Sequence, residues 1–181
     1  MNWCLARISD FSAEEYAAVY ETMSDSRKAH MSTFRHLGAK QQSLAGELLL
    51  RKLLRETGIV TPIERLPSGQ PVLQNEQAFV SIAHCDDHVV CAIHDRPIGI
   101  DIEKVTSVKP GLAERVCTPE ELAYIQGNAS RFFEIWTAKE AYFKMKGTGI
   151  TNFQAVNTLT LPRKLIRQGE YLIQIVCEQK R

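Results

Sequence analysis

The sequence has no excess of charge of either sign. Its 181 residues include 22 basic and 21 acidic side chains, which give a formal net charge of +1. Proteins that bind nucleic acid or anionic membranes through their general surface carry a basic excess. The composition therefore argues against a nucleic-acid or membrane partner, and any site for an anion has to be local.

Long hydrophobic runs and paired cysteines are also missing. No apolar stretch approaches the roughly 20 residues that span a bilayer, and the first residues lack the charged start and apolar run of a signal peptide. The five cysteines are scattered, without a C-x-x-C pair. Scattered, unpaired cysteines are typical of reduced thiols, so we expect a cytoplasmic protein.

What is present is an ordinary globular composition, with 44% hydrophobic and 24% charged residues. The two parts of the chain share one plan: a long helix closed by glycine, a turn-rich link, and a pair of strands. This length suits one large domain or two small lobes around a shared core. We predict an α/β (α+β) fold of two similar αβ lobes, residues 1–97 and 98–181, related by a pseudo-twofold axis in one compact unit.

Hydrophobic periodicity and turn residues predict the individual elements. Helices are expected at residues 12–23, 41–56 and 131–145, with a further helix starting at Thr118. Strands are expected at residues 3–8, 79–82, 89–93, 98–103, 155–161 and 171–176. Residues 27–40 indicate either a solvated connection or an anion-binding loop, and residues 61–71 are rich in turn residues.

The acidic stretch at residues 98–103 reads Ile-Gly-Ile-Asp-Ile-Glu. Alternate side chains of a strand share a face, so Asp101 and Glu103 point one way while Ile100 and Ile102 point into a core. Mg²⁺ takes oxygen ligands from carboxylates placed in this way. Taken alone, the stretch favours the simpler interpretation, which is a half-buried edge strand with a solvated polar face.

The predicted helix 131–145 carries aromatic and charged side chains on one stripe, namely Phe133, Trp136, Glu140 and Lys144. The simplest interpretation of the acid and the lysine is an exposed ion pair one turn apart. The aromatic neighbours indicate partial burial instead. If Glu140 meets Asp101 and Glu103, the three acids can form one face of a Mg²⁺ site, with Lys144 placed for a bridging pyrophosphate.

Two stretches together resemble the signature motifs of the 4′-phosphopantetheinyl transferases in order and separation. They are residues 99–103 (Gly-Ile-Asp-Ile-Glu) and 136–144 (Trp-Thr-Ala-Lys-Glu-Ala-Tyr-Phe-Lys). Residues 44–51 resemble the helix of the family's N-terminal lobe, residues 68–71 its Gly-Lys-Pro turn, and residues 81–84 with 89–93 its serine-histidine strand pair. The length is similar to that of the surfactin-synthetase-associated, single-chain type.

The resemblance implies an enzyme that uses Mg²⁺, with Mn²⁺ as the alternative ion, and coenzyme A as co-substrate. Such an enzyme moves the 4′-phosphopantetheine arm onto a serine of an acyl or peptidyl carrier protein and releases 3′,5′-ADP. The family also implies a monomer that binds the coenzyme between its lobes. Carriers of fatty-acid, polyketide and nonribosomal peptide biosynthesis all stay open.

By position, the resemblance implies that Asp101, Glu103 and Glu140 hold the metal. Glu140 is a candidate to take the serine proton, and Lys144 is implied to hold the pyrophosphate, so these two residues are the predicted catalytic pair. The complete set of implied coenzyme contacts is His84, Lys144, Lys139, Arg35, Lys40, Gln70, Pro71 and Asp101, with Arg35 and Lys40 at the 3′-phosphate.

Three residues depart from the family pattern, and they affect the implied coenzyme contacts more than the implied metal ligands. Ala83 stands where the family has serine, Gln70 replaces the lysine of the Gly-Lys-Pro turn, and Gln42 occupies a position that is often basic. We expect weaker coenzyme binding, or phosphate contacts from neighbours such as Lys40 and Arg35.

Three other readings are open from the residues alone. A metal-dependent phosphodiesterase or nuclease uses similar acids, although it needs a basic track for nucleic acid that this composition does not provide. An inactive module would bind coenzyme A or a carrier protein without chemistry. A zinc site among His84, His88 and His94 with Cys85 and Cys91 is disfavoured because no C-x-x-C or H-E-x-x-H spacing occurs.

Overall fold

The computed structural model describes residues 1–66, 68–75, 77–149 and 152–179. Its helices are α1 (Ala13–Glu21), α2 (Asp25–Ser32), α3 (Leu37–Glu56), α4 (Leu112–Val116), α5 (Pro119–Ile125) and α6 (Ala129–Lys146). Its strands are β1 (Asn2–Arg7), β2 (Ile63–Arg65), β3 (Pro71–Leu73), β4 (Phe79–Cys85), β5 (His88–His94), β6 (Ile98–Lys104), β7 (Arg163–Gln168) and β8 (Tyr171–Cys177).

The described strands form two three-stranded antiparallel sheets, with orders β1-β5-β4 and β6-β8-β7, and a β2–β3 hairpin. The predicted mixed α/β class is therefore confirmed, whereas the pseudo-twofold axis and the lobe boundary stay predictions. Capping boxes begin two of the predicted helices: Glu15 N donates to Ser12 Oγ at the start of α1, and Glu121 N donates to Thr118 Oγ1 at the start of α5.

Three stretches differ from their prediction. Residues 27–40 are not a connection, because α2 begins after its N-cap Ser24 and α3 begins at Leu37. The turn-rich residues 61–71 contain β2 and the first residue of β3, with residue 67 outside the described residues. The strand predicted at 155–161 is wrong, because Asn157 caps a short 3-10 helix there and the strand that follows is β7.

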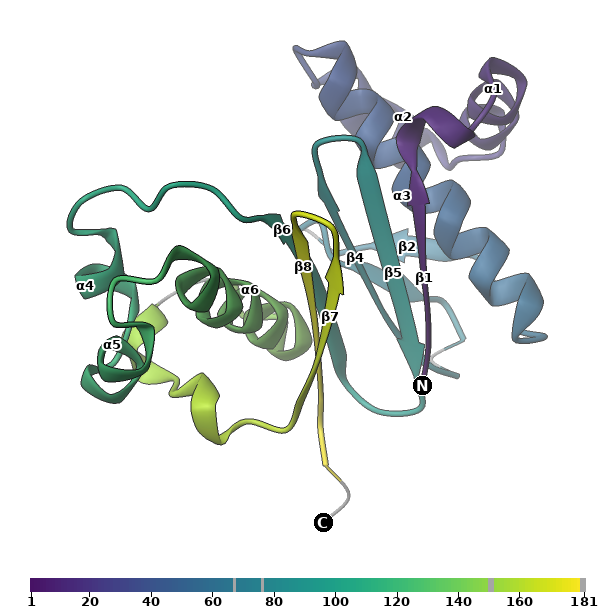
Figure 1. Cartoon of the computed structure of the whole chain (residues 1–181). Coiled ribbons are helices and arrows are strands. Elements are labelled where there is room, and N and C mark those ends of the chain that lie inside the picture. The colour runs from purple at the N-terminus through teal and green to yellow at the C-terminus, as the bar shows by residue number, and fades with distance from the viewer. Residues whose placement is uncertain (67, 76, 150–151, 180–181) are drawn as a thin grey trace.

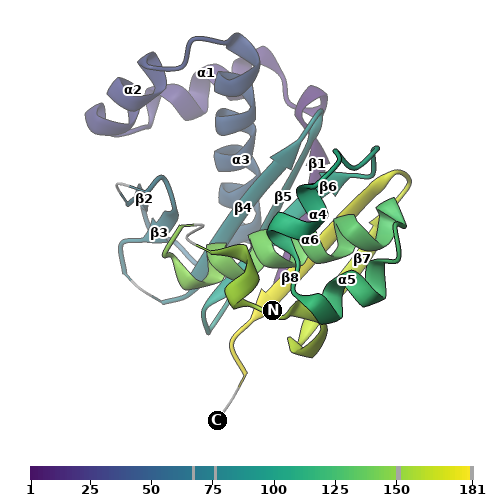
Figure 2. The same ribbon diagram turned by 90° about the vertical axis from the view of Figure 1, so that its left-hand side faces the viewer.

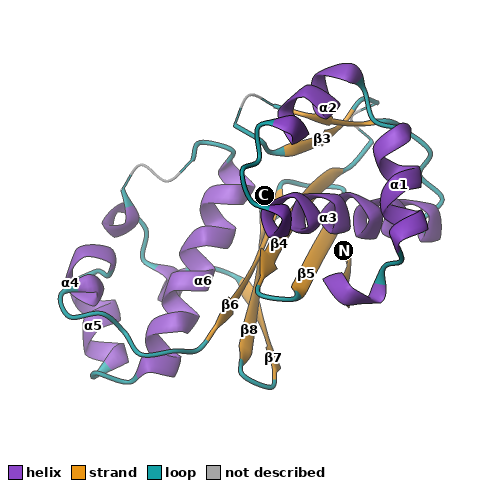
Figure 3. Ribbon diagram, turned by 90° about the horizontal axis from the view of Figure 1, so that it is seen from above, coloured by secondary structure: helices purple, strands orange, loops and turns teal. Residues whose placement is uncertain are grey.

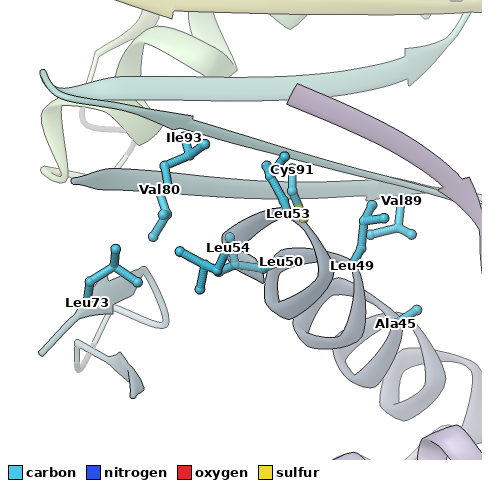
Figure 4. Close-up of a cluster of buried hydrophobic side chains, with 10 residues drawn as sticks. All are labelled: Ala45, Leu49, Leu50, Leu53, Leu54, Leu73, Val80, Val89, Cys91 and Ile93. Carbon is cyan, nitrogen blue, oxygen red and sulfur yellow. The ribbon is translucent and has the colours of Figure 1, made fainter. Parts of the chain in front are cut away.

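The first core lies between α3 and the β1-β5-β4 sheet (Figure 4). Successive side chains of β5 point to opposite faces. Val89, Cys91 and Ile93 pack against leucines of α3, while Val90 and Ala92 pack against the other three-stranded sheet. Because β5 is buried on both faces, its sequence is almost continuously apolar rather than alternating.

The second core joins the two three-stranded sheets. Ile98, Ile100 and Ile102 of β6 meet Val90 and Ala92 of β5 in it. The strands thus lie between α3 on one side and α6 on the other (Figure 3). This packing confirms that the isoleucines of β6 face a core and leaves the opposite face of β6, with its two acids, turned toward α6.

Helix α6 lies along β6 and β8, and α4 and α5 pack on its outer side (Figure 1). The β2–β3 hairpin lies beside the C-terminal end of α6 (Figure 2), where Gln70 Nε2 donates to Lys144 O at 3.2 Å. Helix α6 therefore contacts both the acidic strand β6 and the hairpin from the first half of the chain. Within the described residues, no helix combines the length and apolarity that crossing a membrane requires.

Candidate active site

The two motif-bearing elements, β6 and α6, lie in close contact. A Cβ atom placed on Gly99 would lie 1.8 Å from the carbonyl oxygen of Ala141 and 2.7 Å from the backbone nitrogen of Met145. Real side chains cannot approach backbone so closely, so a glycine is required at this position. Because Gly99 has no side chain, the polar face of β6 comes within hydrogen-bond distance of α6.

Asp101 is paired with Lys144 across this contact. Lys144 Nζ lies 2.6 Å from Asp101 Oδ1, and the Asp101 side chain is only 8% exposed. Burial raises the pKa of Asp101, and the Lys144 ammonium opposes that rise. Asp101 Oδ2 is buried and has no hydrogen-bond partner in the described part of the chain. One oxygen of this acid therefore lacks a hydrogen-bond partner.

Glu103 is held by a neutral donor instead of a charged one. Trp136 Nε1 donates to Glu103 Oε1 at 2.9 Å. Burial is the main cause that raises the pKa of Glu103, followed by the negative charge of Asp101, while the indole hydrogen bond lowers it. The environment thus favours a cation or a proton near this pair of acids.

Glu140 lies on α6, one turn before Lys144, and the negative charges of Asp101 and Glu103 both act on its carboxyl group. Burial and the charge of Asp101, with a smaller effect of Glu103, raise the pKa of Glu140 to about 7, although Lys144 opposes the rise. A carboxylate with a pKa near neutrality is well matched to accept a proton in general-base catalysis. Glu140 therefore has the electrostatic character of a catalytic base.

A cavity of about 520 Å³ opens beside these groups, between α3, the β2–β3 hairpin, β4 and the C-terminal half of α6. Its walls include five of the predicted site residues, together with all three departures from the family pattern. The predicted residues are His84, Gln70, Pro71, Glu140 and Lys144, and the departures are Gln42, Gln70 and Ala83. The structure therefore brings the predicted coenzyme contacts of β4, the hairpin and α6 together.

The polar side chains of this cavity differ in charge and in hydrogen bonding. Partial burial and the Lys144 ammonium lower the pKa of His84, so its imidazole is neutral over a wider pH range. The amide of Gln70 donates to the carbonyl oxygen of Lys144, and Gln42 Nε2 donates to Asp86 O at 3.3 Å. Both glutamines thus use one donor within the protein.

The structure does not bring Lys139 to the cavity. Its side chain is fully buried, its ammonium lies 2.8 Å from Glu121 Oε2, and it also donates to the carbonyl oxygens of Phe153 and Val156. A buried charge held by three oxygens is a structural feature of α5 and α6. We therefore assign Lys139 to the fold and withdraw it from the predicted coenzyme contacts.

Arg35 and Lys40 are likewise not among the residues that line the cavity. Because α3 starts at Leu37, Lys40 lies in the first turns of that helix, and its Nζ is 5.0 Å from the centroid of the Tyr20 ring. Arg35 is exposed just before the helix. Their predicted contact with the 3′-phosphate therefore stays a prediction.

Arg65 is a cavity residue that sequence reasoning missed. It lines the 520 Å³ cavity and also a larger hollow of about 1550 Å³ next to it. Its Nη1 donates to Gly69 O at 3.0 Å, and its buried Nε has no partner within the described residues. Burial and the nearby Arg27 lower its pKa to about 10. Its sequence signal was its place just before the Ser-Gly-Gln-Pro turn at residues 68–71.

The donor set fits Mg²⁺ in its chemistry, because every candidate ligand is a carboxylate oxygen. Asp101 Oδ2 has no partner in the described part of the chain, and after burial the negative charge of Asp101 raises the pKa of both Glu103 and Glu140, so both observations favour a cation between the acids. Among the described residues, however, no three acid, histidine or cysteine side chains are gathered closely enough to hold an ion, for zinc or for magnesium. The acids would therefore have to rotate toward a metal, and the triad stays a prediction.

Comparisons with known proteins agree with this geometry. A family model described as the 4′-phosphopantetheinyl transferase superfamily matches residues 97–179. The chain is 35% identical over 137 residues to the 4′-phosphopantetheinyl transferase gsp of Aneurinibacillus migulanus, which covers 69% of this chain and 57% of that protein. It is 31% identical over 140 residues to the 4′-phosphopantetheinyl transferase psf-1 of Bacillus pumilus, covering 71% and 60%.

A more distant relative covers slightly more of both chains. The 4′-phosphopantetheinyl transferase Sfp of Bacillus subtilis strain 168 is 25% identical over 150 residues, or 77% of this chain and 67% of that protein. The chain thus spans about three fifths of the length of the two relatives named first. The matched region includes both β6 and α6, and the chain belongs to the 4′-phosphopantetheinyl transferase superfamily.

Proposed function

We propose that this protein transfers the 4′-phosphopantetheine arm of coenzyme A to a serine hydroxyl of an acyl or peptidyl carrier protein. One observation carries the proposal: Glu140, with a pKa near 7, and the Lys144 ammonium line the same cavity as His84. This cavity offers a base for a hydroxyl and positive charge for a diphosphate within one site.

The reaction exchanges one ester bond for another. The serine oxygen bonds to the β-phosphorus of the coenzyme, the bond from that phosphorus to the bridging oxygen breaks, and 3′,5′-ADP leaves. Glu140 takes the serine proton, directly or through a water. Lys144 balances charge on the diphosphate, and Asp101, Glu103 and Glu140 would hold Mg²⁺. When bound, that ion offsets the negative charge that develops on the departing phosphate.

The remaining phosphate contacts follow from the cavity walls. His84 donates to a phosphate oxygen from the β4 side, and Arg65, which lines the same cavity, offers a second positive charge. We therefore add Arg65 to Arg35 and Lys40 as a proposed partner of the 3′-phosphate. It also compensates in part for the missing side-chain groups at Ala83 and Gln70, which lie in the same walls.

The proposed setting is cytoplasmic and monomeric. All five cysteines are free, which suits a reducing compartment. The carrier protein can belong to fatty-acid, polyketide or nonribosomal peptide synthesis, since all three kinds of carrier present a serine acceptor.

Mass spectrometry of candidate apo-carrier proteins tests the proposal. Incubation with this protein, coenzyme A and Mg²⁺ should add one phosphopantetheine arm to the carrier serine, and omission of coenzyme A or addition of EDTA should prevent it. Plasmid incubated in parallel should stay intact. Unmodified carriers from all three pathways, together with cleaved plasmid, would favour the phosphodiesterase reading instead.

We predict that Lys144→Ala mainly weakens the use of coenzyme A. A hydrogen bond to a charged group contributes about 1.5–3 kcal/mol, which corresponds to a rise in the KM for coenzyme A of roughly 10–100-fold. Steady-state titration of coenzyme A measures the change, and a melting curve shows whether the loss of the Asp101 partner also affects folding.

Lys146→Ala is the matched control for this prediction. Lys146 lies on the same helix but is exposed and does not line the cavity. Its replacement should leave the coenzyme A titration unchanged. If Lys144→Ala behaves like Lys146→Ala, then Lys144 is only a surface charge and has no phosphate contact.

A further inference from the structure

The indole of Trp136 is the partner that the structure gives to Glu103. Its Nε1 donates to Glu103 Oε1 at 2.9 Å, and the described residues supply no other hydrogen bond to this carboxylate. Because an indole N–H only donates and carries no charge, it fixes one oxygen without neutralising the acid. The second oxygen, Oε2, keeps its capacity for a ligand.

The indole is itself held in place by packing on its face. Its ring stacks on Phe153, with centroids 5.1 Å apart and an interplanar angle of 26°. The carbonyl oxygen of Phe153 accepts a hydrogen bond from Lys139 Nζ at 2.7 Å, and Lys139 is fixed by its buried ion pair with Glu121. The buried lysine of the motif therefore anchors the residue against which Trp136 stacks.

We propose that Trp136 is a positioning residue, which holds Glu103 Oε1 and thereby directs Oε2 toward the divalent cation of the site. The inference rests on the proposed function, since Glu103 is one of the acids proposed to hold Mg²⁺. Hydrogen-bond partners of metal ligands fix ligand orientation, and their loss typically weakens metal affinity or activity 10–100-fold. A purely structural tryptophan would have no such effect on metal affinity.

Trp136→Phe separates these two roles. Phenylalanine keeps an aromatic ring against Phe153 but removes the N–H that Glu103 accepts. We expect the folded variant to bind Mn²⁺ 10–100-fold more weakly than the wild type, measured by electron paramagnetic resonance on protein without coenzyme. The KM for Mg²⁺ in transfer should rise by a similar factor, while kcat at saturating Mg²⁺ changes by less than about threefold.

Trp3→Phe is the matched control, because Trp3 is the other of the two tryptophans and lies on β1, outside the site. This variant should bind Mn²⁺ like the wild type. Wild-type Mn²⁺ affinity in the Trp136→Phe protein would overturn the inference. So would an equal loss of affinity in both variants, because that result shows a general effect of removing an indole.

A second measurement decides the matter if Trp136→Phe does not fold. In the Trp3→Phe protein, Trp136 is the sole indole fluorophore, and Mg²⁺ bound at Glu103 should change its emission saturably. Emission that stays constant while the ion binds overturns the inference, as does a wild type that binds no Mn²⁺. A wild type that binds Mn²⁺ but modifies no carrier contradicts the proposed function alone, and the ratio of Mn²⁺ affinities still tests Trp136.

Discussion

We expect Glu140→Gln to lower the rate of arm transfer at least about a hundredfold, because general acid–base assistance typically contributes 10²–10⁴-fold. The amide has nearly the shape of the acid but cannot accept the serine proton. The fold should survive, since burial and Asp101 already disfavour the charged form and raise the pKa of Glu140 to about 7. Replacing that acid by a neutral group removes an electrostatic cost.

The measurement is the transfer rate at saturating coenzyme A and carrier, with circular dichroism and a melting curve on the same preparation. Glu21→Gln provides the matched control, because Glu21 is exposed at the end of α1 and does not line the cavity. It should retain the wild-type rate. Wild-type turnover by a folded Glu140→Gln protein would remove Glu140 from the mechanism.

The sequence predicts elements best where local patterns and tertiary packing agree. α3 carries a broad leucine face, β5 is an apolar run, and α5 begins with a complete capping box, so all three were predicted near their observed positions. α2 was missed because only Met31 of its eight residues is buried, and its charged sequence suggests a loop. β7 was missed for a similar reason, since an edge strand with three basic residues shows no apolar alternation.

The false strand at 155–161 has a tertiary cause. Leu159 and Leu161 suggest alternation, yet Thr158 is fully buried, and both its backbone N–H and its hydroxyl donate to Glu121 Oε1. Glu121 comes from α5, so no window around Thr158 contains the reason for its conformation. A buried carboxylate from another element determined this segment.

The residues of the candidate site show the same difference between local patterns and contacts from distant elements. The acids of β6 and the stripe of α6 follow from strand and helix periods, and the structure places them on facing surfaces. Lys139 lies within the same motif, but its partner Glu121 is supplied by a separate helix. Arg65 belongs to the β2–β3 hairpin, whose short strands were not predicted because the surrounding sequence is rich in proline and glycine. Residues whose environment comes from distant elements were therefore misplaced or missed.

Gly99→Ala should have the largest effect on stability. A methyl group at Gly99 would lie 1.8 Å from Ala141 O, so α6 has to move away from β6. Forcing atoms into a packed interior typically costs 1–3 kcal/mol and occasionally more, and contact with rigid backbone belongs to the upper end. We expect a loss of at least about 3 kcal/mol, which lowers the melting temperature of a chain of this size by roughly 6–12 °C.

Gly38→Ala distinguishes this steric effect from a general cost of replacing glycine. Nothing lies within 4 Å of a Cβ at Gly38, which is in the exposed first turn of α3, so alanine should be neutral or slightly stabilising there. Because Asp101 and Lys144 bridge the same β6–α6 contact, Gly99→Ala should also lose transfer activity beyond its unfolded fraction, measured well below its melting temperature. A stable and active Gly99→Ala protein would show that β6 and α6 lie farther apart than this structure places them, and the acids of β6 would then be too distant from Lys144 and Glu140 to act with them.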